Sequence, residues 1–213
     1  MILRTALPSP FGRMVKISAY VLGLEDRFQV ELCNTMDAED SIRQQNPLGK
    51  IPALITDDSV IYDSRVIMEY LDQMAGGGKI IPSGGDARID VLTRTAMACG
   101  LLDAALLVIY EGRFRPEDMQ VESFVEYQRD KIRRTLDYVA GQNLKYGNGA
   151  MPDAGEIGLA CCLDYLDFRK QLDWRDHAPG LADWMMDFAK SVPGYQQTLP
   201  PEIDPSPWRQ AQS

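Results

Sequence analysis

Positive charge is scarce in this sequence. Its 213 residues include 22 lysines and arginines against 31 aspartates and glutamates, so the formal net charge is -9. A surface of that sign repels polyanions, which excludes a broad electrostatic grip on nucleic acid or on anionic lipid. Any anion that this protein binds must therefore be held by a few local basic groups.

Long apolar runs are also missing from the sequence. We find no run that approaches the roughly 20 residues needed to cross a bilayer, and the start, Met1-Ile-Leu-Arg, lacks the layout of a secretory signal. We therefore expect a cytosolic protein without a membrane partner. Apolar residues make up 45% and charged residues 25%, a balance that predicts a folded protein with a buried core.

Cysteine and histidine are few, and their spacing does not favour metal binding. Cys33, Cys99, Cys161 and Cys162 form no C-x-x-C pair. We expect them to be reduced structural thiols and expect no metal site. The single histidine, His177, lies in a predicted loop without a partner motif, so we expect no catalytic role for it.

Short β-type runs and helical patterns are mixed over the first 75 or so residues. Strands are predicted at residues 1–6 and 28–33, with a helix over residues 10–22 between them and Gly23 as its stop. This is a β-α-β unit.

Two further strands are predicted at residues 52–56 and 60–62. The turn residues between them, Asp57-Asp58-Ser59, favour an antiparallel hairpin. A helix then begins near Ser64, and its predicted apolar face comprises Val66, Ile67, Tyr70, Leu71 and Met74.

Glycines interrupt the pattern after this helix, and everything beyond them is predicted to be helical. We divide the chain into a first domain at residues 1–76, a linker at 77–85 and an all-helical domain at 86–213. Long helices are expected over residues 86–113 and 117–143, and a shorter one over 179–191. Asp153 and Glu156 form a capping-box pattern that predicts another helix start.

The first cluster of functional interest contains Lys50, Ile51 and Pro52. An X-Pro bond readily becomes cis, and a bend there turns backbone groups outward to pair with an extended ligand. The alternative is an ordinary turn before a strand.

The second cluster is Asp63-Ser64, at the junction of a short strand and a helix. The helix N-terminus attracts a carboxylate, and Asp63 would accept from an ammonium group, so together they suit the head of an amino acid. Asp63 is equally typical of a plain helix cap.

The third cluster is Ser9-Pro10-Phe11-Gly12-Arg13, at the first strand-to-helix turn. A serine before a proline is the commonest way to begin a helix, so Ser9 is either a cap or a functional hydroxyl. Its order relative to the other two clusters predicts that all three lie at one edge of the sheet.

Taken together, these motifs resemble the bacterial cytosolic glutathione transferases with a serine at the active-site position. The resemblance rests on Ser9-Pro10-Phe11-x-Arg13, on Asn46-Pro-Leu-Gly-Lys-Ile-Pro-Ala-Leu, and on Asp63-Ser64 followed by a helix. It covers nearly the whole chain. It implies a thioredoxin-like first domain, an all-helical second domain, and a homodimer that binds one glutathione per subunit.

The resemblance also implies roles for individual residues. Ile51 would pair through its backbone with the cysteinyl part of glutathione, Pro52 being the cis residue, and Lys50 would meet the glycyl carboxylate. Asp63 and Ser64 would hold the γ-glutamyl head. Ser9 would donate a hydrogen bond to the sulfur, helped by the first helix and by Arg13, unless Arg13 is a solvated surface charge.

Two departures from the family pattern and several open positions remain. Asp153 replaces the usual serine or threonine of the capping box, and Gly12 replaces a branched apolar residue, which is expected to loosen the first helix by roughly 1 kcal/mol. Asp103 either approaches a neighbouring subunit's ligand or has a helix-capping or surface role. Tyr110 and Phe114 either line a pocket for a second substrate or pack in the core.

Two classes of function follow from the sequence. The first is an enzyme that activates the glutathione thiolate for attack on a hydrophobic electrophilic small molecule, or for a related thiol-dependent reaction such as reductive cleavage, peroxide reduction or isomerisation. The second is a non-catalytic protein that keeps the fold and binds glutathione or a partner.

Overall fold

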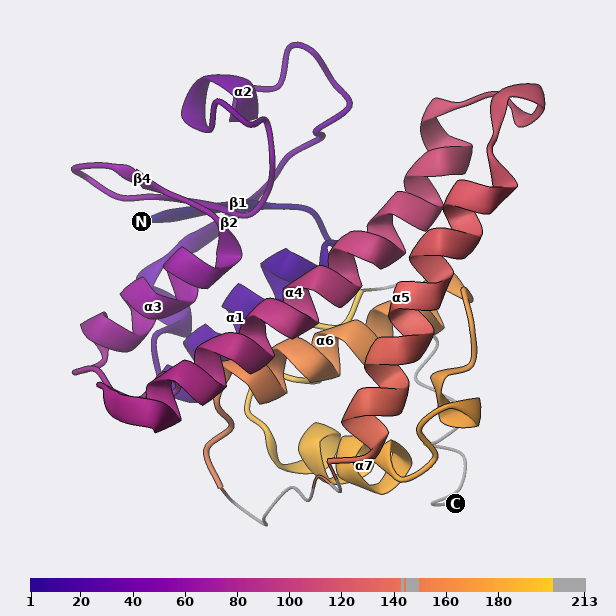
Figure 1. The fold of residues 1–213 in the computed structure, drawn as a ribbon. Helices are drawn as coiled ribbons and strands as arrows, with labels where there is room; N and C mark the ends of the chain where they lie inside the picture. Colours follow the sequence, from indigo (N-terminus) through magenta and orange to yellow (C-terminus); the bar gives the residue numbers. More distant parts are fainter. Residues whose placement is uncertain (143, 145–149, 201–213) are drawn as a thin grey trace.

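The computed structural model describes residues 1–142, 144 and 150–200. It shows a small sheet layer beside a bundle of long helices (Figure 1). The elements, in chain order, are β1 (Ile2–Thr5), α1 (Pro10–Leu22), η1 (Glu25–Arg27), β2 (Gln29–Leu32), α2 (Ile42–Gln45), β3 (Ala53–Ile55), β4 (Val60–Ile61), α3 (Ser64–Met74), α4 (Gly85–Phe114), η2 (Glu117–Met119), α5 (Glu122–Ala140), α6 (Ala154–Arg169), η3 (Trp174–Asp176) and α7 (Leu181–Ser191).

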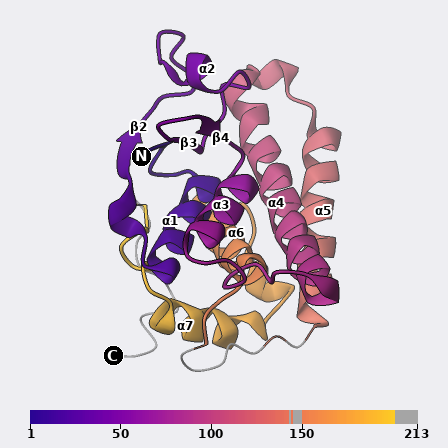
Figure 2. The same cartoon turned by 90° about the vertical axis from the view of Figure 1, so that its left-hand side faces the viewer.

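The four strands form one sheet in the order β2-β1-β3-β4. β1 is parallel to β2, with Leu3 opposite Val30, and antiparallel to β3, with Leu3 opposite Leu54. β4 completes the predicted hairpin with β3. Helices α1 and α3 cover one face of the sheet, and the segment that contains α2 lies on the other side (Figures 1 and 2). The expected β-α-β and β-β-α order is therefore confirmed.

The helix ends follow the local chemistry of the sequence. Ser9 caps α1, Pro10 occupies its first position, and Gly23 ends it with a left-handed φ of 68°. At α6, both hydrogen bonds of the capping box are present, between Asp153 and Glu156. Aspartate thus serves as well as serine would at this position.

The long helices α4 and α5 lie side by side, and α6 runs through the middle of the bundle (Figures 1 and 2). Helix α6 is buried around most of its circumference and packs against both α1 and α4. It therefore connects the sheet layer to the helical part of the molecule.

One expectation about apolar runs is wrong. By length and composition α4 would suffice to cross a membrane, because an 18-residue window of it reaches a mean hydropathy of 1.6. This helix packs against α5 and α6 instead, and the core helices of globular proteins pass the same test. The apolar character of α4 is thus explained by its position in the bundle.

Several predicted boundaries and faces also need correction. The helix predicted from residue 117 begins at Glu122, because Pro116 opens the short η2 and the Glu111 carboxylate accepts from the Val121 N–H at 2.8 Å. Its predicted end, Asn143, lies outside the described residues. On α3, Val66 is 51% exposed while Met68 is fully buried, so the apolar face is rotated from the one predicted. The short elements η1, α2 and η3 were not predicted.

Candidate functional site

The strand register brings the three predicted clusters to one edge of the sheet. Arg4, near the end of β1, lies opposite Ala53, the first residue of β3. Leu54 lies opposite Ile61, the last residue of β4. Consequently the turn after β1, the residues just before β3 and the residues just after β4 all leave the sheet at the same edge.

Ser9 is half-buried at the start of α1, where it has two local hydrogen bonds. Its hydroxyl oxygen accepts from the Gly12 N–H at 3.1 Å, and its own N–H donates to the Ala6 carbonyl at 3.0 Å. A hydroxyl has one donor and two acceptor positions. The cap uses only an acceptor position of Ser9, so its O–H hydrogen is available to a ligand.

The bend at residues 51 and 52 contains the predicted cis peptide bond between Ile51 and Pro52. Among the described residues, Ile51 has no hydrogen-bond partner in a turn, in a loop or on a side chain, so its backbone groups are available to a ligand. The bend is stabilised by Asn46. This side chain is buried, and its amide nitrogen donates to the Lys50 carbonyl at 2.9 Å. Lys50 itself is exposed. Sequence reasoning included Asn46 in the motif but did not assign it this supporting role.

Asp63 caps α3 and also binds its neighbour Arg65. Its carboxylate accepts from the Arg65 N–H at 3.0 Å and pairs with the Arg65 guanidinium at 2.8 Å. Burial alone would raise the pKa of Asp63, but the hydrogen bonds and charge of Arg65 lower it below its usual value. The peptide bond between Tyr62 and Asp63 is also cis, which the sequence did not indicate.

Ser64 is buried, and its hydroxyl is directed toward α4. It lies near the thiol of Cys99, whose pKa is raised to about 12 by burial. At that value the thiol stays protonated and unreactive at neutral pH. The structure therefore supports Cys99 as a packing residue.

Asp103, further along α4, lies close to the same edge in its own chain. The charges of Lys50 and Arg65 favour its ionised form, and the charge of Asp63 opposes it. Burial nevertheless raises the pKa of Asp103 above its usual value. Of the alternatives weighed from the sequence, helix capping is wrong, because Asp103 lies in the middle of α4.

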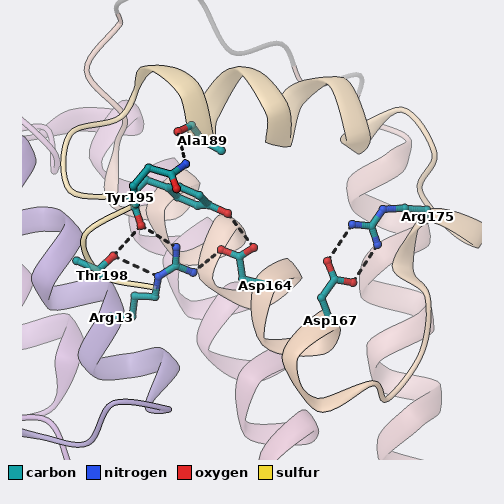
Figure 3. A network of polar contacts seen from close by, with 8 residues as sticks. Arg13, Asp164, Asp167, Arg175, Ala189, Tyr195 and Thr198 are labelled. Atoms are coloured by element: carbon teal, nitrogen blue, oxygen red, sulfur yellow. Dashed lines mark hydrogen bonds and ion pairs between the residues drawn. The ribbon is translucent and has the colours of Figure 1, made fainter. Parts of the chain in front are cut away.

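Arg13 is buried, so the alternative that it is a solvated surface charge is wrong. It is 3% exposed and pairs with Asp164 of α6. Its guanidinium also donates to the Tyr195 carbonyl and to the Thr198 hydroxyl, each at 3.3 Å (Figure 3). Burial alone would lower the pKa of Arg13, but the negative charge of Asp164 raises it, so Arg13 stays protonated. These partners are more than 150 residues away in sequence, and no local pattern could have identified them.

The histidine and the cysteines do not add to the candidate site. His177 contacts Asp137 of α5 at 3.2 Å, away from the three clusters. All four cysteines fall within the described residues and are free thiols, three of them buried. No group of three or more potential metal ligands occurs among residues 1–142, 144 and 150–200.

Comparison with known proteins gives the family. A model of the glutathione S-transferase N-terminal domain matches residues 3–79, and one of the C-terminal domain matches residues 90–185. An uncharacterised GST-like protein of Escherichia coli (strain K12), YibF, is 32% identical over 167 residues, which is 76% of this chain and 80% of that protein.

Solved structures agree with the family models. A glutathione transferase family member from Pseudomonas fluorescens Pf-5 with bound glutathione is 38% identical, with a TM-score of 0.85, and the match covers 94% of this chain and 98% of that one. A structure of a family member from the same organism with bound S-(propanoic acid)-glutathione is 37% identical, with a TM-score of 0.81 and coverage of 94% and 100%. The expected thioredoxin-like first domain and all-helical second domain are therefore confirmed.

Proposed function

Because this chain belongs to the glutathione S-transferase family, we propose that it is a cytosolic glutathione transferase of the serine type, which attacks a small electrophile with the glutathione thiolate. The observation that carries the proposal is the position of Ser9. Its hydroxyl has a free donor at the N-terminus of α1, at the same sheet edge as the cis bend and the cap of α3.

The proposed glutathione site follows this edge. Ile51 pairs through its backbone with the cysteinyl part of an extended tripeptide, and Lys50 meets its glycyl carboxylate. The γ-glutamyl ammonium group binds Asp63, whose lowered pKa keeps it ionised. The γ-glutamyl carboxylate meets the backbone N–H of Ser64 at the N-terminus of α3, because the Ser64 hydroxyl is directed toward α4. Two solved relatives contain glutathione or a glutathione derivative, which supports glutathione as the co-substrate.

Ser9 would then face the glutathione sulfur. A free thiol with a pKa near 8.5 is only about 3% thiolate at pH 7. Lowering that pKa to about 6.5, a change of roughly 2.7 kcal/mol, makes most of it thiolate. The Ser9 hydroxyl and the α1 dipole are the groups that supply this stabilisation. Arg13 contributes indirectly, because its charge is already paired with Asp164.

We also propose that the chain is a homodimer whose subunits meet through α4 and α5. The exposed face of these helices contains a hollow of about 390 Å³, lined by apolar and basic side chains from both helices. Tyr138, one of the residues that line it, is 60% exposed. An open hollow with this mixed apolar and basic lining suits a second copy of the chain.

Replacement of Ser9 tests the proposed activity. In Ser9→Ala we expect glutathione to bind within a few-fold of the original affinity, while the pKa of the bound thiol returns to near 8.5. The measurement is the ultraviolet absorbance of the bound thiolate as a function of pH, together with the rate of conjugation to a generic aromatic halide.

The conservative variant separates this role from the helix cap. Ser9→Thr keeps both a capping oxygen and a donor hydroxyl, so it should restore the low pKa and most of the rate. An unchanged thiol titration in Ser9→Ala would reject the role of Ser9. Binding of glutathione without any turnover by the original protein would instead favour a non-catalytic binding protein.

A further inference from the structure

A wall of aromatic rings lies beside Ser9. Tyr165 and Phe168, near the end of α6, line the same crevice as Pro8 and Ser9. From the end of α4, Tyr110 lies close enough to Tyr165 to influence its pKa, and it packs edge-on against Phe114 at 5.2 Å. The rings of α6 therefore lie next to the reacting end of the proposed glutathione site, and Tyr110 of α4 lies near Tyr165.

Two arginines lie on these rings. The Arg169 guanidinium carbon is 4.5 Å from the centre of the Phe168 ring, and its Nε donates to the Tyr165 hydroxyl at 3.3 Å. The Arg113 guanidinium carbon is 5.3 Å from the centre of the Tyr110 ring. A guanidinium that lies on a ring is held in place while most of its N–H groups remain available to a carboxylate.

Neither arginine has an acidic partner among the described residues, and this distinguishes them from most others. Ten arginines of the described chain form ion pairs, namely Arg4, Arg13, Arg65, Arg88, Arg94, Arg115, Arg129, Arg133, Arg134 and Arg175. In a chain of net charge -9, two unpaired guanidiniums next to one site create a local positive field. That field selects for a negatively charged ligand.

We propose that the electrophile is an aromatic compound with a carboxylate, whose ring lies on Tyr165, Phe168 and Tyr110 while its carboxylate binds Arg169 and Arg113. This assignment rests on the proposed transferase function and names its substrate class. For a 4-chloro-3-nitrobenzoate, the thiolate forms a C–S bond at the carbon that bears chlorine. Chloride leaves with the bonding electron pair, and the thiol proton goes to solvent, so no further reactant is needed.

A matched pair of electrophiles tests the proposal. We compare kcat/KM for 4-chloro-3-nitrobenzoate with that for 4-chloro-3-nitrobenzamide, which has the same shape without the charge. The benzoate should be preferred, and Arg169→Gln should lower its kcat/KM about 10-fold while the value for the amide changes less than about 2-fold. Arg113→Gln should act in the same direction. The matched control is Arg27→Gln at the end of η1. Arg27 forms no ion pair within the described part of the chain, and its replacement should change neither value.

A binding measurement keeps this proposal distinct from the proposed function. S-(4-carboxybenzyl)glutathione should bind more tightly than S-(4-carbamoylbenzyl)glutathione, and Arg169→Gln should remove the difference. If the protein turns over neither halide, the transferase function fails, and these two affinities alone decide the ligand class. Equal affinities, or an equal loss for benzoate and amide in Arg169→Gln, would overturn the carboxylate proposal.

Discussion

At the scale of single residues, Gly12 shows how a position can be fixed by a contact that is distant in sequence. A Cβ atom added to Gly12 would lie 1.9 Å from Thr5 Oγ1 and 3.1 Å from Thr5 Cβ. Thr5 is fully buried at the end of β1. Glycine at this position therefore lets α1 approach the sheet.

We expect Gly12→Ala to destabilise the protein by about 1 to 3 kcal/mol through overpacking, although alanine is the better helix former. Urea unfolding measures this change. When Thr5 is already replaced by alanine, Gly12→Ala should lower the free energy of unfolding much less, because the contacting hydroxyl is gone. Equal costs of Gly12→Ala in the two backgrounds would show that the contact with Thr5 does not matter.

From the sequence, Gly12 was recognised as unusual, but its contact with Thr5 was not foreseen. The loosening of α1 expected from propensity stays a prediction, and the structure adds that Gly12 permits close packing of α1 against Thr5. The roles of Ser9 and Asp63 as caps were predictable because each depends on residues two or three positions away. The partners of Gly12 and Arg13 belong to other elements, so only the fold reveals them.

At the scale of secondary-structure elements, the Arg13–Asp164 pair joins α1, α6 and the segment after α7. The Tyr195 hydroxyl donates to Asp164 at 2.9 Å, and the Tyr195 ring lies 4.6 Å from the Arg13 guanidinium carbon (Figure 3). Arg13 also holds Thr198 of the same segment. This network therefore anchors residues 195–198 against the helix that begins at Ser9.

Removing one partner of this pair should be costly. Asp164→Ala leaves a buried guanidinium unpaired, so we expect a loss of about 3 to 5 kcal/mol in the free energy of unfolding. The matched control is Asp130→Ala on α5, where Asp130 pairs with Arg134 and both side chains are at least half exposed. That change should cost less than about 1 kcal/mol. The double variant Arg13→Met, Asp164→Leu should be more stable than Asp164→Ala, because neither charge remains buried. If its loss in the free energy of unfolding equals the sum of the losses in its two single variants, the pairing is contradicted.

At the scale of the whole molecule, the sheet layer and the helical part share one hydrophobic core. Leu3 and Ile67 belong to the same buried cluster as Ile157 and Leu163 of α6. The Asp72 carboxylate accepts from three successive backbone N–H groups, those of residues 78–80, which ties the predicted linker to α3. Composition and glycine spacing led us to predict a boundary after residue 76, and that boundary stays a prediction. They gave no measure of how firmly the two parts pack, which depends on side chains from both.

The open face of α4 and α5 has no role inside one chain that the described residues reveal. If a second copy covers it, the protein should have a mass in solution of twice 23.9 kDa, measured by light scattering after size-exclusion chromatography. Tyr138→Glu places a charge beside the hollow and should shift the protein toward monomer, with a thermal midpoint that no longer depends on protein concentration. Leu32→Glu is the control, because Leu32 is similarly exposed, at 57%, but lies on the edge strand β2. A monomeric original protein, or dissociation by both variants alike, would exclude this face as the dimer interface.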